Sequence, residues 1–242
     1  MPLAIPTLRP TLTNCVVLLD IDGTLLTGPS SGLSPGVAAM ETAARHITGR
    51  AGLHQQVEFA GRTDRQIARD LLLAGGLANP SRDDTSRLLA LYIEDLETRL
   101  AASSCRPLGD VRGSVHAMQI AGCTVGFGTG NLLRGARAKL ASAGILTIFD
   151  SLVGGFGDDA DERDELLRIG AQRCDPTGEK SVVVVGDTPY DVQAASAIHA
   201  LCIGVTTGPY DEQSLRQSGA ADVVHQLDAS LVDRIESLLR SR

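Results

Sequence analysis

The sequence has no tryptophan, and aromatic residues of any kind make up only 3% of its 242 residues. Hydrophobic residues nevertheless amount to 43%, so leucine, valine, isoleucine and alanine must fill the core. No apolar run approaches the roughly 20 residues that a membrane-spanning helix needs. Positive charge is also scarce, because 22 basic residues face 29 acidic ones and the net charge is −7. A nucleic-acid partner favours a basic surface, so the composition argues against one.

Cysteine pairs are missing as well. The five cysteines are scattered and include no Cys-x-x-Cys motif, which indicates reduced thiols in a cytoplasmic protein. The first 14 residues hold three prolines and one basic residue, and they lack the charged start and apolar stretch of a signal peptide. We expect them to form a disordered or loosely docked lead-in. The length suits one large domain or a core domain with an insert.

The pattern of elements divides the chain into two kinds of segment. Residues 34–105 show only helical spacing, with helices expected at 34–47, 63–73 and 81–102. From residue 106 onward, strands and helices alternate. We expect strands at 124–129, 145–153, 181–187, 201–205 and 222–225, with helices at 111–121, 132–143, 161–174, 189–197 and 212–217, and a final helix after them. Such alternation predicts an α/β protein with a doubly wound parallel sheet.

A pair of carboxylates follows the first strand. Residues 16–19 are apolar and lead straight into Asp20. Asp22 follows two positions later, and Gly23 comes directly after it. Ligands bind at the carboxyl ends of strands in open α/β sheets. Two carboxylates there are costly unless a cation neutralises them, and Mg²⁺ is a suitable hard cation. The alternative is an ordinary Asp-Gly turn.

A second pair, Asp187 and Asp191, repeats this arrangement after the strand at 181–187. Asp191 lies one helical turn beyond Asp187, so both side chains can face the same way. The alternative is that Asp187 only caps the helix that starts at Pro189. Two strand ends that carry carboxylates can converge only if the strands are close in the sheet.

Thr129 ends another expected strand, and its hydroxyl could donate to a phosphate oxygen, as could the amides of Gly130 and Asn131. The alternative is a helix N-cap. The run Gly126-Phe127-Gly128-Thr129-Gly130 also hints at a dinucleotide loop of an oxidoreductase. However, Asn131 stands where the third glycine of that fingerprint belongs, so we discount it.

These stretches resemble the motifs of the haloacid dehalogenase-like hydrolase superfamily, in its phosphoglycolate phosphatase-like branch. The resemblance implies a Rossmann-like core, residues 1–27 and 106–242, with an inserted all-helical cap at 28–105. It implies that Asp20 is the nucleophile and Asp22 the general acid/base. It also implies that Thr129 holds phosphoryl oxygens, and that Mg²⁺ is bound by Asp20, the Asp22 carbonyl and Asp187, with Asp191 as a further ligand or as a support.

The family's remaining motif is a lysine one helix before the last aspartates, and this chain departs from it. Arg163 stands there, 23 residues before Gly186, whereas Lys180 lies just before the strand, far from the carboxylates. We therefore expect Arg163 to neutralise the aspartyl and phosphate charges; the alternative is a solvated charge at a helix start. In the helical segment, the stretch Gly61-Arg62-Thr63-Asp64 resembles the family's cap loop, and Arg62 could reach the substrate. The alternative is that this stretch is a plain helix N-terminus.

The resemblance implies a Mg²⁺-dependent phosphatase that acts on a small-molecule phosphate ester. It leaves open a sugar phosphomutase of the same superfamily and a non-catalytic homologue that binds metal or phosphate. We expect a cytoplasmic monomer or homodimer, with neither nucleic acid nor membrane as a partner.

Overall fold

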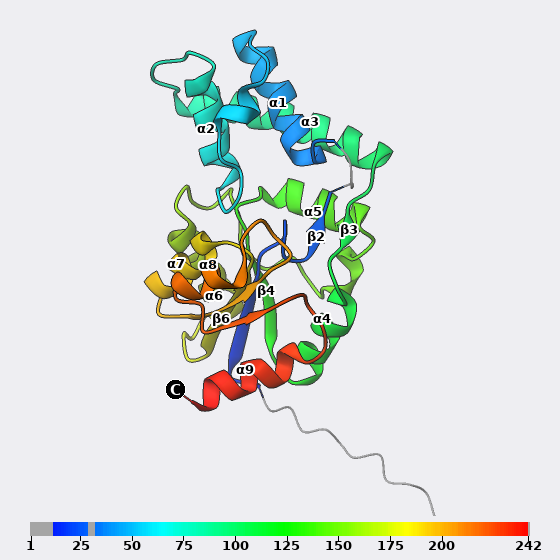
Figure 1. Ribbon diagram of the computed structural model, residues 1–242, viewed down its shortest axis with the longest axis vertical. Helices are drawn as coiled ribbons and strands as arrows, with labels where there is room; N and C mark the ends of the chain where they lie inside the picture. The colour runs from blue at the N-terminus through cyan, green and yellow to red at the C-terminus, as the bar shows by residue number, and fades with distance from the viewer. Residues whose placement is uncertain (1–11, 29–31, 242) are drawn as a thin grey trace, which may run out of the picture.

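The computed structural model describes residues 12–28 and 32–241, so most of the expected lead-in lies outside the described residues. Its centre is a six-stranded parallel sheet with the strand order β5-β4-β1-β6-β7-β8 (Figure 1). The strands are β1 (Cys15–Leu19), β4 (Thr124–Gly128), β5 (Gly154–Gly155), β6 (Ser181–Gly186), β7 (Leu201–Val205) and β8 (Asp222–Val224). Strand β1 lies at the middle, with Val17 in register with Val125 on one side and Val183 on the other.

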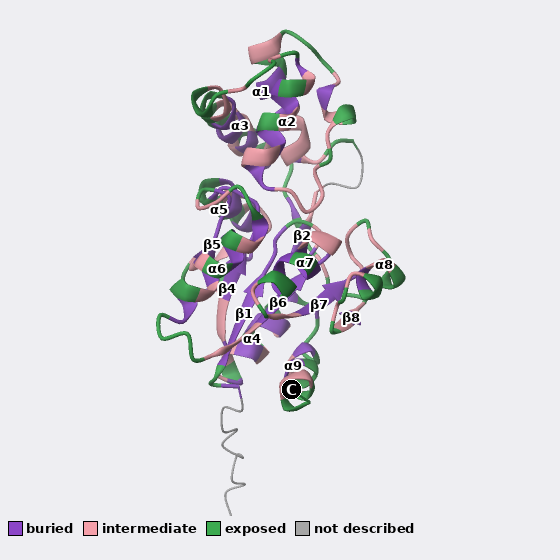
Figure 2. Ribbon diagram, turned by 90° about the vertical axis from the view of Figure 1, so that its left-hand side faces the viewer, coloured by how far each residue is buried: buried purple, intermediate pink, exposed green. Residues whose placement is uncertain are grey.

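Helices cover both faces of this sheet, as Figure 2 shows by the buried strands between them. Alternate residues of β1 enter two separate apolar clusters, Val17 and Leu19 on one face and Val16 and Leu18 on the other. The first face packs against α4 (Val111–Ile120), α5 (Leu133–Ser142) and α9 (Leu231–Arg240); the second packs against α6 (Arg163–Cys174), α7 (Pro189–Ala197) and α8 (Glu212–Gln217). The predicted α/β, doubly wound parallel sheet is therefore confirmed.

Three helices form a separate layer beyond the carboxyl ends of the strands (Figure 1). They are α1 (Pro35–Thr48), α2 (Asp64–Ala74) and α3 (Arg82–Ala102), with the short 3₁₀ helix η1 (Leu53–Gln56) between the first two. Ser34, Thr63 and Ser81 cap them through side-chain oxygens, which satisfies amides that each helix start leaves free. The chain enters this layer through β2 (Leu26–Thr27) and leaves it through β3 (Arg106–Pro107), and these two strands pair antiparallel.

The expectation of a strand within residues 145–153 is wrong. That segment contains the 3₁₀ helix η2 (Leu146–Ile148), and the strand β5 follows it at two glycines. An added Cβ would lie 2.2 Å from the backbone oxygen of Phe127 at Gly154, and 1.9 Å from that of Leu166 at Gly155. Close packing against β4 and α6 thus selects glycine, and a search for apolar runs cannot see such a strand. Among the described residues, no helix is both long and apolar enough to cross a membrane.

Candidate active site

Asp20 lies directly after β1, and only 6% of it is exposed. Its backbone N–H donates to the carbonyl of Val185 at 2.9 Å, which ties the end of β1 to β6. Burial raises the pKa of Asp20 to about 6, because it removes water from the charged form; the guanidinium of Arg163 offsets part of this, and Asp191 and Asp22 add to it. A nearby cation therefore stabilises the charged form of this buried carboxyl.

The turn after Asp20 brings the next strand's carboxylate close. Gly23 has a φ of +80°, and a Cβ at this position would lie 2.2 Å from Oδ2 of Asp187. Both the left-handed conformation and the missing side chain therefore require glycine here. The hydroxyl of Thr24 donates to Oδ1 of Asp187 at 3.1 Å. The Asp-Gly sequence thus forms a turn, as the alternative interpretation predicts. This turn also fixes the side chain of Asp187, through the hydrogen bond from Thr24 and the close approach at Gly23.

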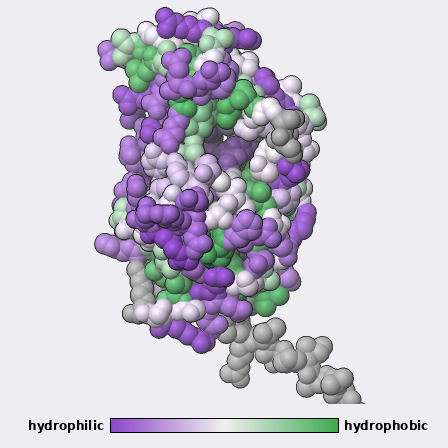
Figure 3. Space-filling view, in the orientation of Figure 1, coloured by the Kyte–Doolittle hydropathy of each residue, from purple (hydrophilic) through white to green (hydrophobic). Residues whose placement is uncertain are grey.

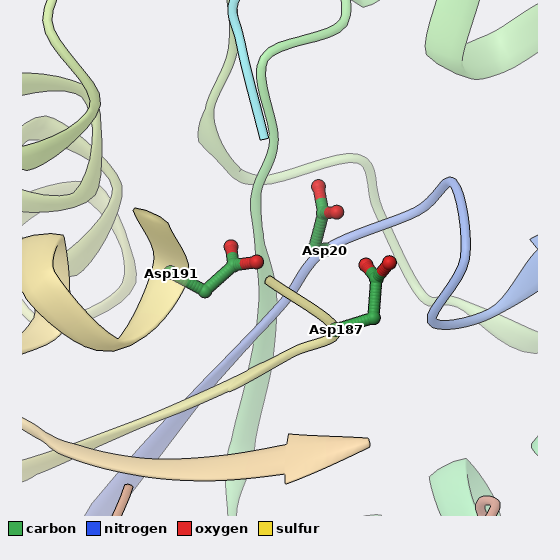
Figure 4. Close-up of side chains that lie close together, drawn as sticks. All are labelled: Asp20, Asp187 and Asp191. Carbon is green, nitrogen blue, oxygen red and sulfur yellow. The ribbon is translucent and has the colours of Figure 1, made fainter. Parts of the chain in front are cut away.

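Asp187, Asp20 and Asp191 gather their carboxylates at the carboxyl ends of β1 and β6 (Figure 4). One oxygen from each lies within 4.8 Å of the others, and all three residues are buried. Burial, with the charges of Asp20 and Asp191, raises the pKa of Asp187 to about 8. The N-cap of α7 is Thr188, which accepts from the amide of Asp191, so the alternative that Asp187 caps this helix is wrong.

The donor set fits a hard divalent cation. Asp20 and Asp187 offer carboxylate oxygens whose mutual repulsion a cation would relieve. Asp191 already accepts hydrogen bonds at both oxygens: at Oδ2 from the amide and hydroxyl of Thr188, 3.0 and 2.7 Å away, and at Oδ1 from Arg163. Asp191 is therefore better suited to support the site than to bind the cation directly. The carboxylate of Asp22 lies outside this cluster.

Arg163 is the first residue of α6, and its side chain is 9% exposed. Its guanidinium lies 3.0 Å from Oδ1 of Asp20 and donates to Oδ1 of Asp191 at 2.5 and 2.9 Å. Burial alone would lower the pKa of Arg163, but Asp191 and Asp20 hold it above its ordinary value. The alternative of a solvated helix-start charge is wrong. Lys180 donates instead to the hydroxyl of Thr124, at the opposite end of the sheet.

Thr129 is fully buried after β4, and its hydroxyl accepts from the side-chain amide of Asn131 at 2.9 Å. The N-cap of α5 is Leu132, so Thr129 does not cap that helix. The glycines of β4 serve packing: an added Cβ at Gly128 would lie 2.3 Å from the side chain of Leu167 on α6. This accounts for the glycine run without a dinucleotide.

A cavity of about 260 Å³ lies between the helical layer and the strand ends, and Figure 3 shows a recess near this junction. Its walls include Asp20, Asp22, Arg62, Gly130, Asn131, Arg163 and Asp187; Thr129 and Asp191, although described, do not line it. Arg62 donates to Oδ2 of Asp70 at 3.0 Å. Its Nε is buried and has no hydrogen-bond partner within the described part of the chain. Because Arg62 lines the cavity, its guanidinium is suited to bind an oxygen of a ligand there.

Lys139, Asp64 and Tyr92 also line this cavity, although sequence patterns alone did not single them out as site residues. Lys139, on α5, donates to Oδ2 of Asp22 and to Oδ1 of Asn131, both at 2.6 Å. Burial alone would lower the pKa of Lys139, yet Asp22, Tyr92 and Asp64 raise it. Burial raises the pKa of Asp64 to about 6, although Lys139 opposes this.

A sequence signal for Lys139 exists. Helix α5 buries Gly135, Ala136, Lys139 and Leu140, so the lysine lies on the apolar stripe of that helix. A charged residue at such a position needs a buried partner. Asp64 and Tyr92 give no comparable signal, since they meet Lys139 only through the tertiary packing of the helical layer on the core.

Comparison with known proteins identifies a family that the sequence matches. The family model for haloacid dehalogenase-like hydrolases matches residues 16–199. No curated protein matches the sequence.

Several solved structures share the fold over nearly the whole chain. A predicted phosphatase of Clostridium acetobutylicum has a TM-score of 0.68 at 18% identity, covering 96% of this chain and 100% of its own. For a predicted phosphoglycolate phosphatase of Haemophilus somnus the TM-score is 0.67, with 16% identity and coverage of 93% and 98%. For a candidate β-phosphoglucomutase of Bacteroides vulgatus it is 0.64, with 16% identity and coverage of 96% and 91%. At these identities the likeness shows the fold alone.

Proposed function

The chain belongs to the haloacid dehalogenase-like hydrolase family, and on that premise we propose that it is a Mg²⁺-dependent phosphatase of small-molecule phosphate monoesters. The observation that carries the proposal is the position of Arg163, buried between Asp20 and Asp191 beside Asp187. A nucleophilic carboxylate must approach a phosphate that is itself negative. The site supplies one fixed cation and an oxygen cluster suited to a second.

Asp20 and Asp187 would hold Mg²⁺, together with the Asp22 carbonyl, and Asp191 would support them. When bound, Mg²⁺ neutralises charge on the phosphate and stabilises the charge that develops during transfer. This assignment draws on the hard oxygen donors gathered at the two strand ends.

In the first step, Asp20 attacks phosphorus and the bond from phosphorus to the ester oxygen breaks, which leaves an aspartyl-phosphate. Asp22 gives a proton to the departing oxygen. In the second step, water attacks phosphorus, Asp22 accepts its proton, and the carboxylate of Asp20 is regenerated. Arg163 lies close enough to Asp20 to bind the transferred group's oxygens, and Thr129, Gly130 and Asn131 follow the strand beside it. Catalysis is then mostly positioning and charge stabilisation.

We assign residues 28–105 to a cap that closes the substrate cavity, and residues 1–27 and 106–242 to the catalytic core. The antiparallel pair of β2 and β3, at the two crossings between these parts, supports this division. Arg62 enters the cavity from the cap, so we assign it to substrate binding. The cavity suits a small ester. All five cysteines are buried free thiols, in keeping with the cytoplasmic location that we expect.

The test is phosphate release from a panel of sugar, glycolate, glycerol and nucleoside monophosphates at pH ~7, with Mg²⁺ and with EDTA. We expect Mg²⁺-dependent turnover of at least one small ester, and none by Asp20→Asn, because an amide is not a nucleophile here. Near wild-type turnover by Asp20→Asn would contradict the assignment. A second arm compares sugar monophosphates with and without added sugar bisphosphate. Isomerised sugar phosphate in place of free phosphate would favour a phosphomutase, and no reaction in either arm would favour a non-catalytic binder.

A further inference from the structure

Lys139 is a buried amine that the phosphatase mechanism above does not use. Its side chain is 8% exposed, and it is one of only two lysines in the chain. It extends from α5 of the core toward the helical layer, where an added Cβ at Gly36 of α1 would lie 3.4 Å from its Nζ. Burying an ammonium costs free energy unless anionic partners and hydrogen bonds offset it. The partners of Lys139 therefore indicate why it is there.

Lys139, Asn131 and Asp22 form a closed triangle of hydrogen bonds. Nζ of Lys139 donates to Oδ2 of Asp22 and to Oδ1 of Asn131, and Nδ2 of Asn131 donates to the same Oδ2 of Asp22 at 2.8 Å. Asn131 is itself fixed by its bond to the hydroxyl of Thr129. One oxygen of Asp22 is thus held by two donors, and Oδ1 has no hydrogen bond to any described residue.

This fixation matters because the side chain of Asp22 is 52% exposed. A half-exposed carboxylate is free to change rotamer, and each rotamer places its oxygens differently. Proton transfer to a leaving oxygen requires one carboxyl oxygen within hydrogen-bond reach of it. Lys139 and Asn131 restrict Asp22 to an orientation in which Oδ2 is occupied and Oδ1 is available.

Cap residues complete the surroundings of Lys139. Asp64, at the start of α2, accepts from the backbone N–H of Leu132 in the core at 2.9 Å, and Tyr92 of α3 lies beside it. Both act electrostatically on Lys139. The amine therefore has one face toward the core and one toward the cap, and little of the side chain is exposed.

We propose that Lys139 is a positioning residue that, with Asn131, orients Asp22 for proton transfer to the leaving group. The proposal rests on the proposed phosphatase function. It predicts that removing the amine harms the reaction most where protonation matters most, that is, for esters of weakly acidic alcohols.

The test measures kcat/KM for a series of aryl phosphates of graded phenol acidity and for one alkyl phosphate that the wild type hydrolyses. This ratio covers the steps through departure of the leaving group, so hydrolysis of the phosphoenzyme does not mask the effect. For Lys139→Met we expect kcat/KM for the alkyl ester to fall about 100-fold, which is a typical contribution of general acid catalysis. We expect little loss of kcat/KM with p-nitrophenyl phosphate, whose leaving group needs little protonation. The plot of kcat/KM against leaving-group pKa should steepen. Lys180→Met, at the chain's other lysine, should keep the wild-type slope.

Two further variants make the test decisive. In an Asp22→Asn background, Lys139→Met should not steepen the slope further, because the oriented group is already gone. Lys139→Gln keeps a neutral hydrogen-bond donor on a shorter side chain, so it should steepen the slope less than Lys139→Met. It replaces Lys139→Met in the comparison if circular dichroism shows that Lys139→Met does not fold. A parallel loss for all esters, or losses that add to those of Asp22→Asn, would overturn the proposal in favour of a structural or substrate-anchoring lysine. Failure of the wild type to hydrolyse any ester would instead contradict the proposed function.

Discussion

Arg163 forms ion pairs with two buried carboxylates at once, those of Asp20 and Asp191. The four-residue set of Asp20, Asp187, Asp191 and Arg163 carries more negative than positive charge, which is why burial leaves the pKa values of Asp20 and Asp187 raised. Binding of a cation or loss of Arg163 would change this balance in opposite directions. Single substitutions here should therefore affect both turnover and stability.

Arg163→Ala should lower phosphate-ester turnover about 100-fold or more, the usual effect of removing one donor that stabilises a transition state. It should also destabilise the protein by about 3–5 kcal/mol, because it leaves buried carboxylates without their partner. Arg163→Lys should recover much of the turnover, since the role is chiefly charge, but not all of it, since lysine cannot donate through two nitrogens to Asp191. Steady-state kinetics and chemical denaturation of both variants measure these effects.

Lys180→Ala is the matched control for Arg163. Its amine bonds to Thr124 at the far end of the sheet, so its removal should leave turnover nearly unchanged. If Lys180→Ala were crippled and Arg163→Ala were active, the helix α6 would have a structural role only, and the assignment of the family's cationic motif would be wrong.

Site residues of the core were within reach of sequence analysis where they follow apolar strands. Asp20 and Asp187 are predicted to converge because strand ends share one edge of a parallel sheet, and the structure places them together. Lys139 was missed because it lies within a helix, outside any motif, and its partners, Asp22 and Asn131, come from other segments. A lysine on an apolar helical stripe is a signal that periodicity alone passes over.

At the scale of elements, the segment from Glu58 to Asp64 joins the cap to the core. Glu58 accepts from the hydroxyl of Tyr190, at the start of α7, and from that of Tyr210, on a loop of the core, 3.0 and 3.3 Å away. The carbonyl of Gly61 accepts from Arg163 at 3.3 Å, and the amide of Asp64 donates to the carbonyl of Gly130 at 2.8 Å. This segment therefore contacts residues proposed for catalysis directly, and we expect activity to depend on its docking.

Gly61→Ala should disturb this docking. Gly61 has a φ of +71°, and its Cβ would lie 2.4 Å from Cδ2 of Tyr190. We expect kcat/KM to fall about 100-fold, as for other small displacements near a reacting group. Gly49→Ala is the control, because Gly49 has a φ of +72° and meets nothing within 4 Å. Both variants should lose about 1–2 kcal/mol of stability to backbone strain. Equal turnover in the two variants would show that the contact with Tyr190 is irrelevant to activity.

Most elements were predictable because helix caps and strand composition carry local signals. The caps Ser34, Thr63 and Ser81 mark the starts of α1, α2 and α3 in the sequence itself. Strand β5 was not predictable, because Gly154 and Gly155 join the sheet through backbone alone and are selected by contacts with β4 and α6. Its position depends on tertiary packing that no local pattern encodes.

At the scale of the whole molecule, the carboxylate cluster should make stability depend on pH and Mg²⁺. The pKa of Asp187 is raised to about 8, whereas an unfolded aspartate titrates near pH ~3.9. The folded state therefore binds this proton more tightly, and its stability falls as pH rises from about 4 to about 8. A cation that binds only the folded state restores stability by mass action.

Asp187→Asn should remove the contribution of this proton to the pH dependence of stability, and also the stabilisation by Mg²⁺. In metal-free buffer at pH ~8 the variant should melt above the wild type, by roughly 2–4 °C for each kcal/mol recovered. Added Mg²⁺ should raise the Tm of the wild type but not that of the variant. Asp233→Asn, at an exposed position on α9, should follow the wild-type curves. Thermal unfolding across pH and Mg²⁺ concentration measures this, and a Mg²⁺ response retained by Asp187→Asn would argue against Asp187 as a ligand.

In the proposed mechanism Asp20 carries the phosphoryl group, and trapping the aspartyl-phosphate is a direct test of this role. The enzyme is mixed with a phosphate ester that it hydrolyses and Mg²⁺, quenched within one turnover, and reduced with borohydride, which converts an aspartyl-phosphate to homoserine. We predict homoserine at position 20 in the peptide mass spectrum, and none from enzyme without substrate. Turnover with Asp20 recovered unmodified, or homoserine at Asp22 or Asp187 instead, would contradict the account.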